Sequence, residues 1–293
     1  MAIQCRVLEG FHRVPFSRFT SSHTNHRCDR ESGMVMIGAF VDDRPAGLAV
    51  VLCNADNESA LLESIFVDPS ARRRGAGRRL LETTEAICID RSIRTLRGTW
   101  YHDAPSASSI GSLIEACGWS SPEEKSTVHR GGRRVLEHLD RTSRAWRPPE
   151  GFRLESWSDL SDTEIESLGA LRARHEIPIG LHPEGESMLA VSASTSVVLR
   201  RGEEIVGWML NHLIGCETLR YSSLWLRPDL IGRGFGISIT IESSRRHLAV
   251  VDRLPRLIFH VSRDNGAMQR FVQRRLEPGI ERSSRLLVSE RVL

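Results

Sequence analysis

Two glycine-rich loops repeat at a fixed interval in this 293-residue chain, and this repeat constrains the fold more than any other feature. Pro228 follows Pro69 by 228 − 69 = 159 residues, and the same interval separates Gly75 from Gly234. Gly77 and Gly236 share it too. One spacing across three such residue pairs indicates an internal duplication. The length agrees, since domains usually span ~100–200 residues.

Each half shows the same order of elements around its loop. Periodicity predicts strand, turn, strand, a third strand ending at a proline, the loop, a helix, a strand and a last helix. The expected ranges are 34–41, 46–52, 60–67, 95–101 and 108–117 in the first half, and 195–199, 205–210, 219–226, 256–262 and 265–275 in the second. This order predicts a mixed α/β (α+β) fold in which each half is a sheet flanked by helices.

Pro148 and Pro149 mark a break between the halves, because proline fixes the backbone and removes a hydrogen-bond donor. We therefore expect an N-terminal domain at 1–143, a linker at 144–151 and a C-terminal domain at 152–293.

The first loop has the features of a phosphate-binding site. Glycine lets a ligand approach the backbone, and the first N–H groups of the following helix lack intrahelical partners. Those groups and the helix dipole suit an anion, and arginine adds donors that match phosphate geometry. The segment reads Arg72, Arg73, Arg74, Gly75, Ala76, Gly77 and Arg78. The sequence therefore predicts a pyrophosphate ligand.

Two familiar nucleotide motifs do not fit this loop. A P-loop needs Gly-Lys-Ser/Thr, and Gly-Lys does not occur in the chain. A Rossmann fingerprint follows the first strand of a βαβ unit, whereas here a hairpin precedes the strand before the loop. Arg72-Arg73-Arg74-Gly75-Ala76-Gly77, after a strand ending Val67-Asp68-Pro69, resembles instead the Arg/Gln-x-x-Gly-x-Gly/Ala loop of the GNAT acetyltransferases.

That resemblance implies two tandem GNAT-like domains with mostly antiparallel sheets, and acetyl-CoA or another acyl-CoA as co-substrate without a metal. It also implies that the fourth and fifth strands of a domain separate, so that the backbone of the fourth strand pairs with the pantetheine arm. The contacting segments would be Ile65, Phe66 and Val67 in the first copy, and Leu224, Trp225 and Leu226 in the second.

The second copy departs from the pattern at one position. Ile231 replaces the arginine or glutamine of the motif, although Gly232, Arg233, Gly234, Phe235 and Gly236 keep the glycine-rich backbone. Asn265 resembles the asparagine that begins the last helix in this family, where it often contacts the pantetheine arm or has a structural role. The intact loop favours the N-terminal copy for donor binding and catalysis. The tandem arrangement also resembles that of mycothiol synthases, in which the C-terminal copy is active.

Glu63 is the candidate general base, because a carboxylate in an apolar strand is costly without a purpose. If side chains alternate along that strand, Glu63 shares a face with Ile65 and Val67. Its counterpart in the second copy is Ser222. The family's usual acid, a tyrosine in the last helix, is replaced by Ile114 and Val272. Tyr101 or His102, or solvent, could protonate the leaving thiolate instead.

These features favour acyl transfer from acyl-CoA to a small-molecule amine by direct attack. Two alternatives stay open: an aminoacyl-tRNA-dependent transferase of paired GNAT-like fold, and a non-catalytic acyl-CoA sensor or interaction module. The polar region between Phe11 and Gly33 is expected to help shape the acceptor pocket. We expect a monomer or homodimer.

Composition excludes other classes of partner. A net charge of +3 is too small to indicate nucleic-acid binding, and no apolar run reaches the ~18 residues of a membrane span. The six cysteines form no Cys-x-x-Cys pair, which is typical of buried thiols in a reducing compartment. With no apolar signal region near Met1, we expect a cytoplasmic protein. His23, His26 and Cys28 could ligate zinc, but no second ligand cluster follows them.

Overall fold

The computed structural model describes residues 3–30, 32–54, 58–143, 148–183 and 190–293. Its contacts divide the chain into two compact units. Unit 1 comprises Met1–Lys125 and Arg285–Leu293, and unit 2 comprises Ser126–Ser284.

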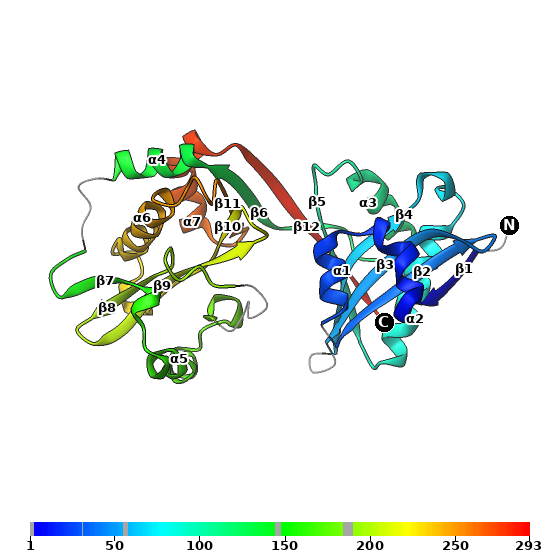
Figure 1. Ribbon diagram of the computed structural model, residues 1–293, viewed down its shortest axis with the longest axis horizontal. Helices are drawn as coiled ribbons and strands as arrows, with labels where there is room; N and C mark the ends of the chain where they lie inside the picture. Colours follow the sequence, from blue (N-terminus) through cyan, green and yellow to red (C-terminus); the bar gives the residue numbers. More distant parts are fainter. Residues whose placement is uncertain (1–2, 31, 55–57, 144–147, 184–189) are drawn as a thin grey trace. The chain divides into compact units, whose positions relative to one another are not determined.

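Unit 1 is a sheet flanked by helices, in the strand order β1-β2-β3-β4-β5-β12 (Figure 1). Within it, β4 and β5 are parallel and the other paired strands are antiparallel. The strands are β1 (Ile3–Val7), β2 (Met34–Val41), β3 (Arg44–Asn54), β4 (Ser59–Val67), β5 (Thr95–Tyr101) and β12 (Arg282–Val292). The helices are α1 (Ser22–Cys28), α2 (Ala76–Asp90) and α3 (Ala107–Ala116), with 3₁₀ segments at Gly10–Phe19 and Pro69–Ala71.

Unit 2 repeats this plan, in the strand order β6-β11-β10-β9-β8-β7, with β10 and β11 parallel. The strands are β6 (Glu123–Gly132), β7 (Phe152–Ser156), β8 (Val197–Arg201), β9 (Glu204–Ile214), β10 (Thr218–Leu226) and β11 (Arg256–Ser262). The helices are α4 (Arg133–Thr142), α5 (Asp162–His175), α6 (Phe235–Leu248) and α7 (Gly266–Phe271), which continues as a π-helical turn at Val272–Leu276. Short 3₁₀ helices occur at Trp157–Asp159, Ile179–Leu181, Pro228–Leu230 and Glu277–Gly279.

The two halves exchange their last strands. By the 159-residue interval β6 and β12 are equivalent, yet β12 pairs with β5 in unit 1 and β6 pairs with β11 in unit 2. Figure 1 shows red β12 beside β5 and green β6 beside β11. The boundaries expected from the sequence therefore differ from this division: 126–143 lie in unit 2, and 285–293 lie in unit 1. The linker positions 144–147 lie outside the described residues.

The β2–β3 hairpin shows why these residues form a central pair of strands. Asp42 and Asp43 both have positive φ, 48° and 62°, which fits the two-residue turn that joins twisted antiparallel strands. Val35 and Ile37 pack in the cluster that contains α2, whereas Met34 and Met36 pack in the cluster that contains Phe16 and Phe19. Both faces of β2 are covered, and this explains its continuous apolar sequence.

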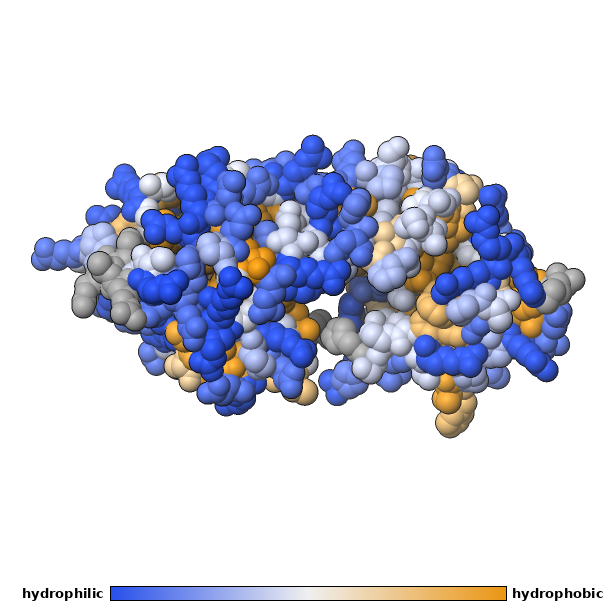
Figure 2. All heavy atoms as spheres, turned by 90° about the horizontal axis from the view of Figure 1, so that it is seen from above, coloured by the Kyte–Doolittle hydropathy of each residue, from blue (hydrophilic) through white to orange (hydrophobic). Residues whose placement is uncertain are grey.

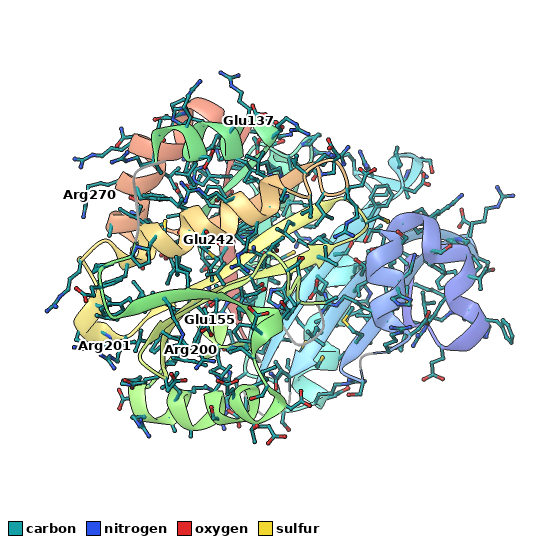
Figure 3. The ribbon with its side chains drawn as sticks, turned by 60° about the vertical axis from the view of Figure 1, so that its left-hand side comes forward. Glu137, Glu155, Arg200, Arg201, Glu242 and Arg270 are labelled. Carbon is teal, nitrogen blue, oxygen red and sulfur yellow. The ribbon has the colours of Figure 1, made fainter. Side chains whose placement is uncertain are left out.

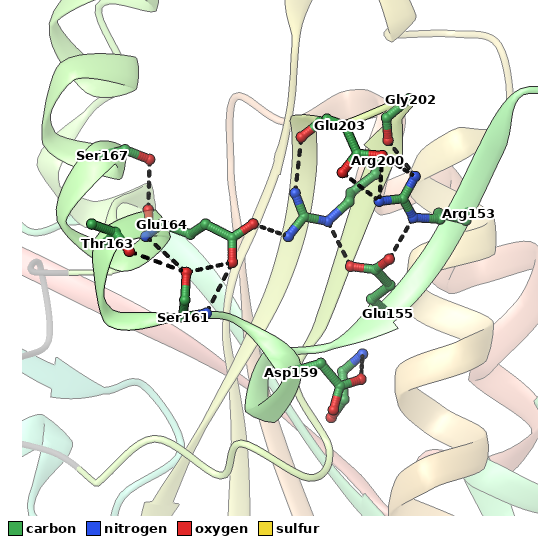
Figure 4. A network of polar contacts seen from close by, with 11 residues as sticks. Arg153, Glu155, Asp159, Ser161, Thr163, Glu164, Ser167, Arg200, Gly202 and Glu203 are labelled. Carbon is green, nitrogen blue, oxygen red and sulfur yellow. Dashed lines mark hydrogen bonds and ion pairs between the residues drawn. The ribbon is translucent and has the colours of Figure 1, made fainter.

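In unit 2, a polar network ties the outer strands to a helix (Figure 4). Arg200 on β8 is 5% exposed and donates from Nε to Glu155 Oε2 on β7 at 2.5 Å. It also donates to Glu164 on α5 and to the carbonyl oxygen of Glu203 at 2.9 Å. Figure 3 shows Glu155 and Arg200 on neighbouring strands of this sheet. One buried guanidinium therefore joins β7, β8 and α5.

Charged and polar residues dominate the molecular surface in Figure 2. Within the described segments, no helix combines the length and the apolar character needed to cross a membrane.

Candidate active site

The first loop holds a helix N-terminus open to a ligand. Gly75 is the residue before α2 and has φ +90°, a left-handed conformation that L-residues rarely adopt. A Cβ added there would come no closer than 4.0 Å to a neighbouring atom, that of Ile3 Cδ1. The space over Gly75 is thus free of protein atoms, and a loop of this shape lets an anion approach the backbone.

Arginines surround this helix start. Arg72, Arg73, Arg74 and Arg78 are all exposed. Arg72 folds back over the end of β4, because its Nε donates to the carbonyl oxygen of Val67 at 3.0 Å. This bond holds the Arg72 guanidinium group beside the loop. Helix N-termini and guanidinium groups are both typical donors to phosphate in proteins.

The strands that lead to each loop separate where the resemblance predicts. In unit 1, β4 pairs with β5 from Ser59 to Leu62, and the pairing ends opposite Gly98. In unit 2, the β10–β11 pairing ends at Tyr221, opposite Phe259. The predicted contact segments, residues 65–67 and 224–226, lie beyond these points. Each pairs with the preceding strand on its other side, so one backbone edge is left for a ligand.

A β-bulge lies at the separation point in both units. Val50 and Val51 of β3 pair with Ser64 and Leu62, so Glu63 is the extra residue. The register of β10 shifts in the same way between Tyr221 and Ser223, around Ser222. A bulge interrupts the alternation of side chains along a strand. The two candidate positions are therefore structurally equivalent.

The bulge overturns one expectation about Glu63. Ile65 and Val67 pack in the cluster that contains α2, whereas Glu63 contacts Arg27 of α1. Glu63 therefore does not share a face with Ile65 and Val67, because strict alternation fails at a bulge. Its carboxylate Oε1 is 2.9 Å from Arg27 Nη1, and its side chain is 18% exposed. No pattern in the sequence indicates this partner.

The second loop keeps the backbone geometry without the same side chains. Gly234 precedes α6 with φ +87°, and Gly232 has φ +80°. Ile231, at the position of Arg72, is 66% exposed and offers no donor from its side chain. Arg233 is exposed, and Gly236 packs close to Leu224 and Leu226.

Several residues predicted to contact the cofactor have buried side chains. Phe235 is 4% exposed and packs against Phe152, with ring centroids 4.4 Å apart. Trp225 is 6% exposed and packs on Trp208 at 4.5 Å. Ala76 is 1% exposed. Only the backbone of these positions is placed to meet a ligand.

Unit 2 contains a cavity between the separated strands and the helices above them, with a volume of about 150 Å³. Asn265 lines it and caps α7, since its side-chain oxygen accepts from the N–H of Met268 at 3.0 Å. Ser222 also lines the cavity, and its hydroxyl lies 2.8 Å from His212 Nδ1.

Half-buried Tyr221, which lines this cavity, and buried His247 form a pair that sequence reasoning missed. His247 Nε2 lies 2.8 Å from the carbonyl oxygen of Leu254, which can only accept, so Nε2 carries the proton. Burial lowers the pKa of His247, which keeps the ring neutral. Nδ1 is then the acceptor for the Tyr221 hydroxyl at 3.1 Å. The 159-residue interval was the available signal, because it aligns this pair with Leu62 and Cys88.

The candidate acids do not form a tyrosine-based site. Ile114 and Val272, at the positions where the family has tyrosine, are core residues, 2% and 5% exposed. Tyr101 ends β5 opposite Leu286 of β12, and the exposed His102 follows it. Among the residues that the structure describes, no group of three or more His, Cys, Asp or Glu side chains could hold a metal ion.

Comparison with known proteins agrees with this geometry. Residues 5–118 match the family described as "Acetyltransferase (GNAT) family". No curated protein matches the sequence.

Solved structures extend the likeness to both units. A tandem GNAT protein from the clavulanic acid biosynthesis pathway aligns with a TM-score of 0.75 at 13% identity, over 99% of this chain and 98% of that one. A GCN5-related N-acetyltransferase from Sphaerobacter thermophilus aligns with a TM-score of 0.64 at 16% identity, over 99% and 95%. A glucosamine N-acetyltransferase region of a fungal multi-domain GH3 β-N-acetylglucosaminidase gives 0.68 at 13%, over 98% of this chain and 38% of that one. At these identities the likeness establishes the tandem fold.

Proposed function

Because residues 5–118 match the GNAT acetyltransferase family, we propose that the protein is an N-acyltransferase that moves an acetyl or other short acyl group from acyl-CoA to an amine of a small molecule. The observation that carries the proposal is the arrangement in unit 1. There the open edge of β4 leads directly into an arginine-rich loop at the start of α2.

Unit 1 is the proposed site of donor binding. Gly75 leaves space at the helix N-terminus, and Arg72, Arg73, Arg74 and Arg78 supply cationic donors for the pyrophosphate. The backbone of residues 65–67 is the proposed partner of the pantetheine amides. In unit 2 the corresponding loop has Ile231 in place of Arg72, which removes one phosphate contact.

Glu63 is the proposed general base. Deprotonation of an amine with a pKa of ~10.4 costs roughly 4 kcal/mol at pH 7.4. A base positioned beside the amine therefore assists its attack on the thioester. The bulge turns Glu63 to the α1 side of the strand, away from the α2 side on which the loop lies. An acceptor amine entering on the α1 side would meet this carboxylate, and Arg27 would hold it in place. Since Ile114 and Val272 replace the usual tyrosine, solvent protonates the leaving thiolate in this scheme.

The proposed partner is a small-molecule amine, with no nucleic acid and no membrane, and the proposed assembly is a monomer or homodimer. A non-catalytic acyl-CoA sensor is the second candidate, because neither copy has the tyrosine.

Calorimetric titration of CoA into the full chain tests donor binding. We expect Gly75→Trp to abolish binding, because its side chain fills the space at the start of α2. The matched control, Gly234→Trp, changes the same position of the second loop and should leave binding within about twofold of wild type. If Gly234→Trp abolishes binding and Gly75→Trp does not, the donor site is in unit 2.

Release of free thiol from acetyl-CoA, measured against a panel of primary amines, tests catalysis. Amine-dependent thiol release supports the transferase. CoA binding without turnover on any amine supports the sensor, and absence of CoA binding by both loops contradicts both proposals.

A further inference from the structure

Two cysteine side chains lie in contact between β3 and α2 of unit 1. We propose that Cys53 and Cys88 form a redox modification site, in which a peroxide oxidises Cys53 and Cys88 then closes a disulfide. Cys88 lies 88 − 75 = 13 residues beyond Gly75, which is about 20 Å along the axis of α2. The site is therefore separate from the arginine-rich loop and does not depend on acyl transfer.

Strand alternation and helical periodicity bring the two thiols together. Ala49, Val51 and Cys53 alternate along β3 and pack toward the cluster that contains α2. On α2, Thr84 and Cys88 lie about one turn apart on the buried face. The sulfur atoms of Cys53 and Cys88 are within hydrogen-bonding distance, and both cysteines are free thiols. A disulfide holds its sulfur atoms ~2.05 Å apart, so thiols already in contact need only a local rearrangement to form one.

Exposure and charge assign different roles to the two thiols. Cys53 is half-buried and Cys88 is buried. The hydrogen bond from Cys88, together with the charge and a hydrogen bond of Arg91 at the end of α2, lowers the pKa of Cys53 to about 7, although burial opposes this. The contact with Cys53 and burial raise the pKa of Cys88, which therefore keeps its proton. Because the thiolate is the reactive form, Cys53 is the thiol that meets the oxidant.

The oxidation proceeds in two steps with hydrogen peroxide as the oxidant. In the first, the Cys53 thiolate attacks one oxygen of the peroxide, the O–O bond breaks, and hydroxide leaves while Cys53 becomes a sulfenic acid. In the second, the Cys88 sulfur attacks the Cys53 sulfur, the S–O bond breaks, and the oxygen leaves as water with the proton of Cys88. Two thiols thus give two electrons to one peroxide, and the products are a disulfide and two waters. A thiol reductant reverses the modification.

The duplication shows that the fold does not require this pair. Cys53 pairs with Ala60 in unit 1, and Leu213 pairs with Leu219 in unit 2, where 219 − 60 = 159. Leu213 is therefore the counterpart of Cys53, and His247 is the counterpart of the second thiol. Since unit 2 has the same arrangement of strands and helix without sulfur at either position, the thiol pair is particular to unit 1.

Cys5 provides a matched control in the same unit. It is also half-buried and packs against the cluster that contains α2. Its side-chain partner is the hydroxyl of Thr83 rather than a thiol, and burial raises its pKa. Cys5 should therefore react slowly and form no link with a residue of α2.

Peptide mapping of the full chain after treatment with hydrogen peroxide tests the site. Trypsin separates the two cysteines, because Arg72 and Arg79 lie between them. After alkylation of the remaining thiols, non-reducing mass spectrometry should detect the Cys53 peptide joined to the Cys88 peptide, and dithiothreitol should release them. Cys53→Ser should abolish this product, and Cys5→Ser should leave its yield within about twofold of wild type. A folded wild-type chain that forms no such product, or forms it only after unfolding in urea, would overturn the proposal.

The variant Cys88→Ser tests the order of the two steps. Serine keeps a hydrogen-bond donor beside Cys53 and cannot form a disulfide, so the sulfenic acid should accumulate on Cys53. Dimedone, which traps sulfenic acids, should label Cys53 roughly tenfold more than Cys5 at pH 7, because more of Cys53 is thiolate. Equal labelling of the two residues in the folded variant, shown by circular dichroism, would contradict the role of Cys53. Neither experiment depends on CoA binding or on turnover.

Discussion

The substitution Arg200→Met should destabilise unit 2 by an amount that depends on pH. Arg200 is buried and donates to Glu155, to Glu164 and to the carbonyl oxygen of Glu203. Methionine retains most of the apolar contact and loses every one of these bonds.

The size of the effect follows from the buried part of the network. A hydrogen bond that involves a charged group contributes about 1.5–3 kcal/mol net. The substitution removes two such bonds, to Glu155 and to the Glu203 carbonyl oxygen. The Glu155 side chain is 26% exposed, so water replaces part of what is lost. We expect a loss of about 2–3 kcal/mol at pH 7.

The sign of the pH dependence follows from the two carboxylates. Hydrogen bonds from Ser161, and then from Arg200, lower the pKa of Glu164 to about 2. Although burial opposes it, hydrogen bonds from Arg153 and Arg200 hold the pKa of Glu155 below its usual value. A lowered folded-state pKa gives stability that is present above the unfolded value of 4.5 and is lost as the pH falls below it. The difference in the free energy of unfolding between wild type and Arg200→Met should therefore be largest at pH 7. It should decrease between about pH 4.5 and 2.

Urea unfolding at pH 7, 4 and 3 measures this gap. Arg201→Met alters the exposed neighbouring residue and is the control, with an expected change within about 0.5 kcal/mol. A gap for Arg200→Met that stays constant from pH 7 to 3 would refute the role of the carboxylates.

Three further outcomes test other parts of the molecule. Glu63→Gln should lower kcat/KM roughly 10²-fold near neutral pH, with partial recovery at high pH where the amine deprotonates unaided, and an unchanged acid limb of the pH–rate profile would remove Glu63 from the mechanism. Tyr221→Phe leaves His247 Nδ1 buried without this donor, so urea unfolding should show a loss of about 1–3 kcal/mol, and a neutral result would contradict the assigned tautomer. Gly75→Ala should lower the free energy of unfolding by about 1–2 kcal/mol, because alanine disfavours φ +90° even though there is space for its Cβ. Ala116→Gly, at the end of α3, provides a comparison at a position without a left-handed backbone.

Elements with strong local signals were predictable from the sequence. The β2 and β5 ranges, 34–41 and 95–101, agree with the structure, and so does β11 at 256–262. The loops were recognisable because glycine is strongly favoured where φ is near +90°, as at Gly75 and Gly234. The strand separation followed from the family resemblance.

Features that depend on tertiary pairing were not predictable. The bulge at Glu63 inserts one residue into an apolar strand without a marker in the sequence, and the alternation rule then placed that side chain on the wrong face. Arg27 lies far from Glu63 in the chain, so no spacing pattern joins them. The strand exchange was also not predictable, because the residue patterns of β6 and β12 are compatible with pairing in either sheet. Only the partner strands in the folded chain distinguish the two arrangements.

The exchange of β6 and β12 makes each half of the chain dependent on the other for a complete sheet. A deletion that removes the second half also removes residues 285–293, and so leaves β5 without its partner strand. A deletion of the first half removes β6 and exposes β11 in the same way. Each copy therefore supplies a strand to the sheet of the other, so folding requires both copies whatever residues their loops carry. A copy that is kept for folding is free to accumulate substitutions such as those around Tyr221, from which a new specificity can arise.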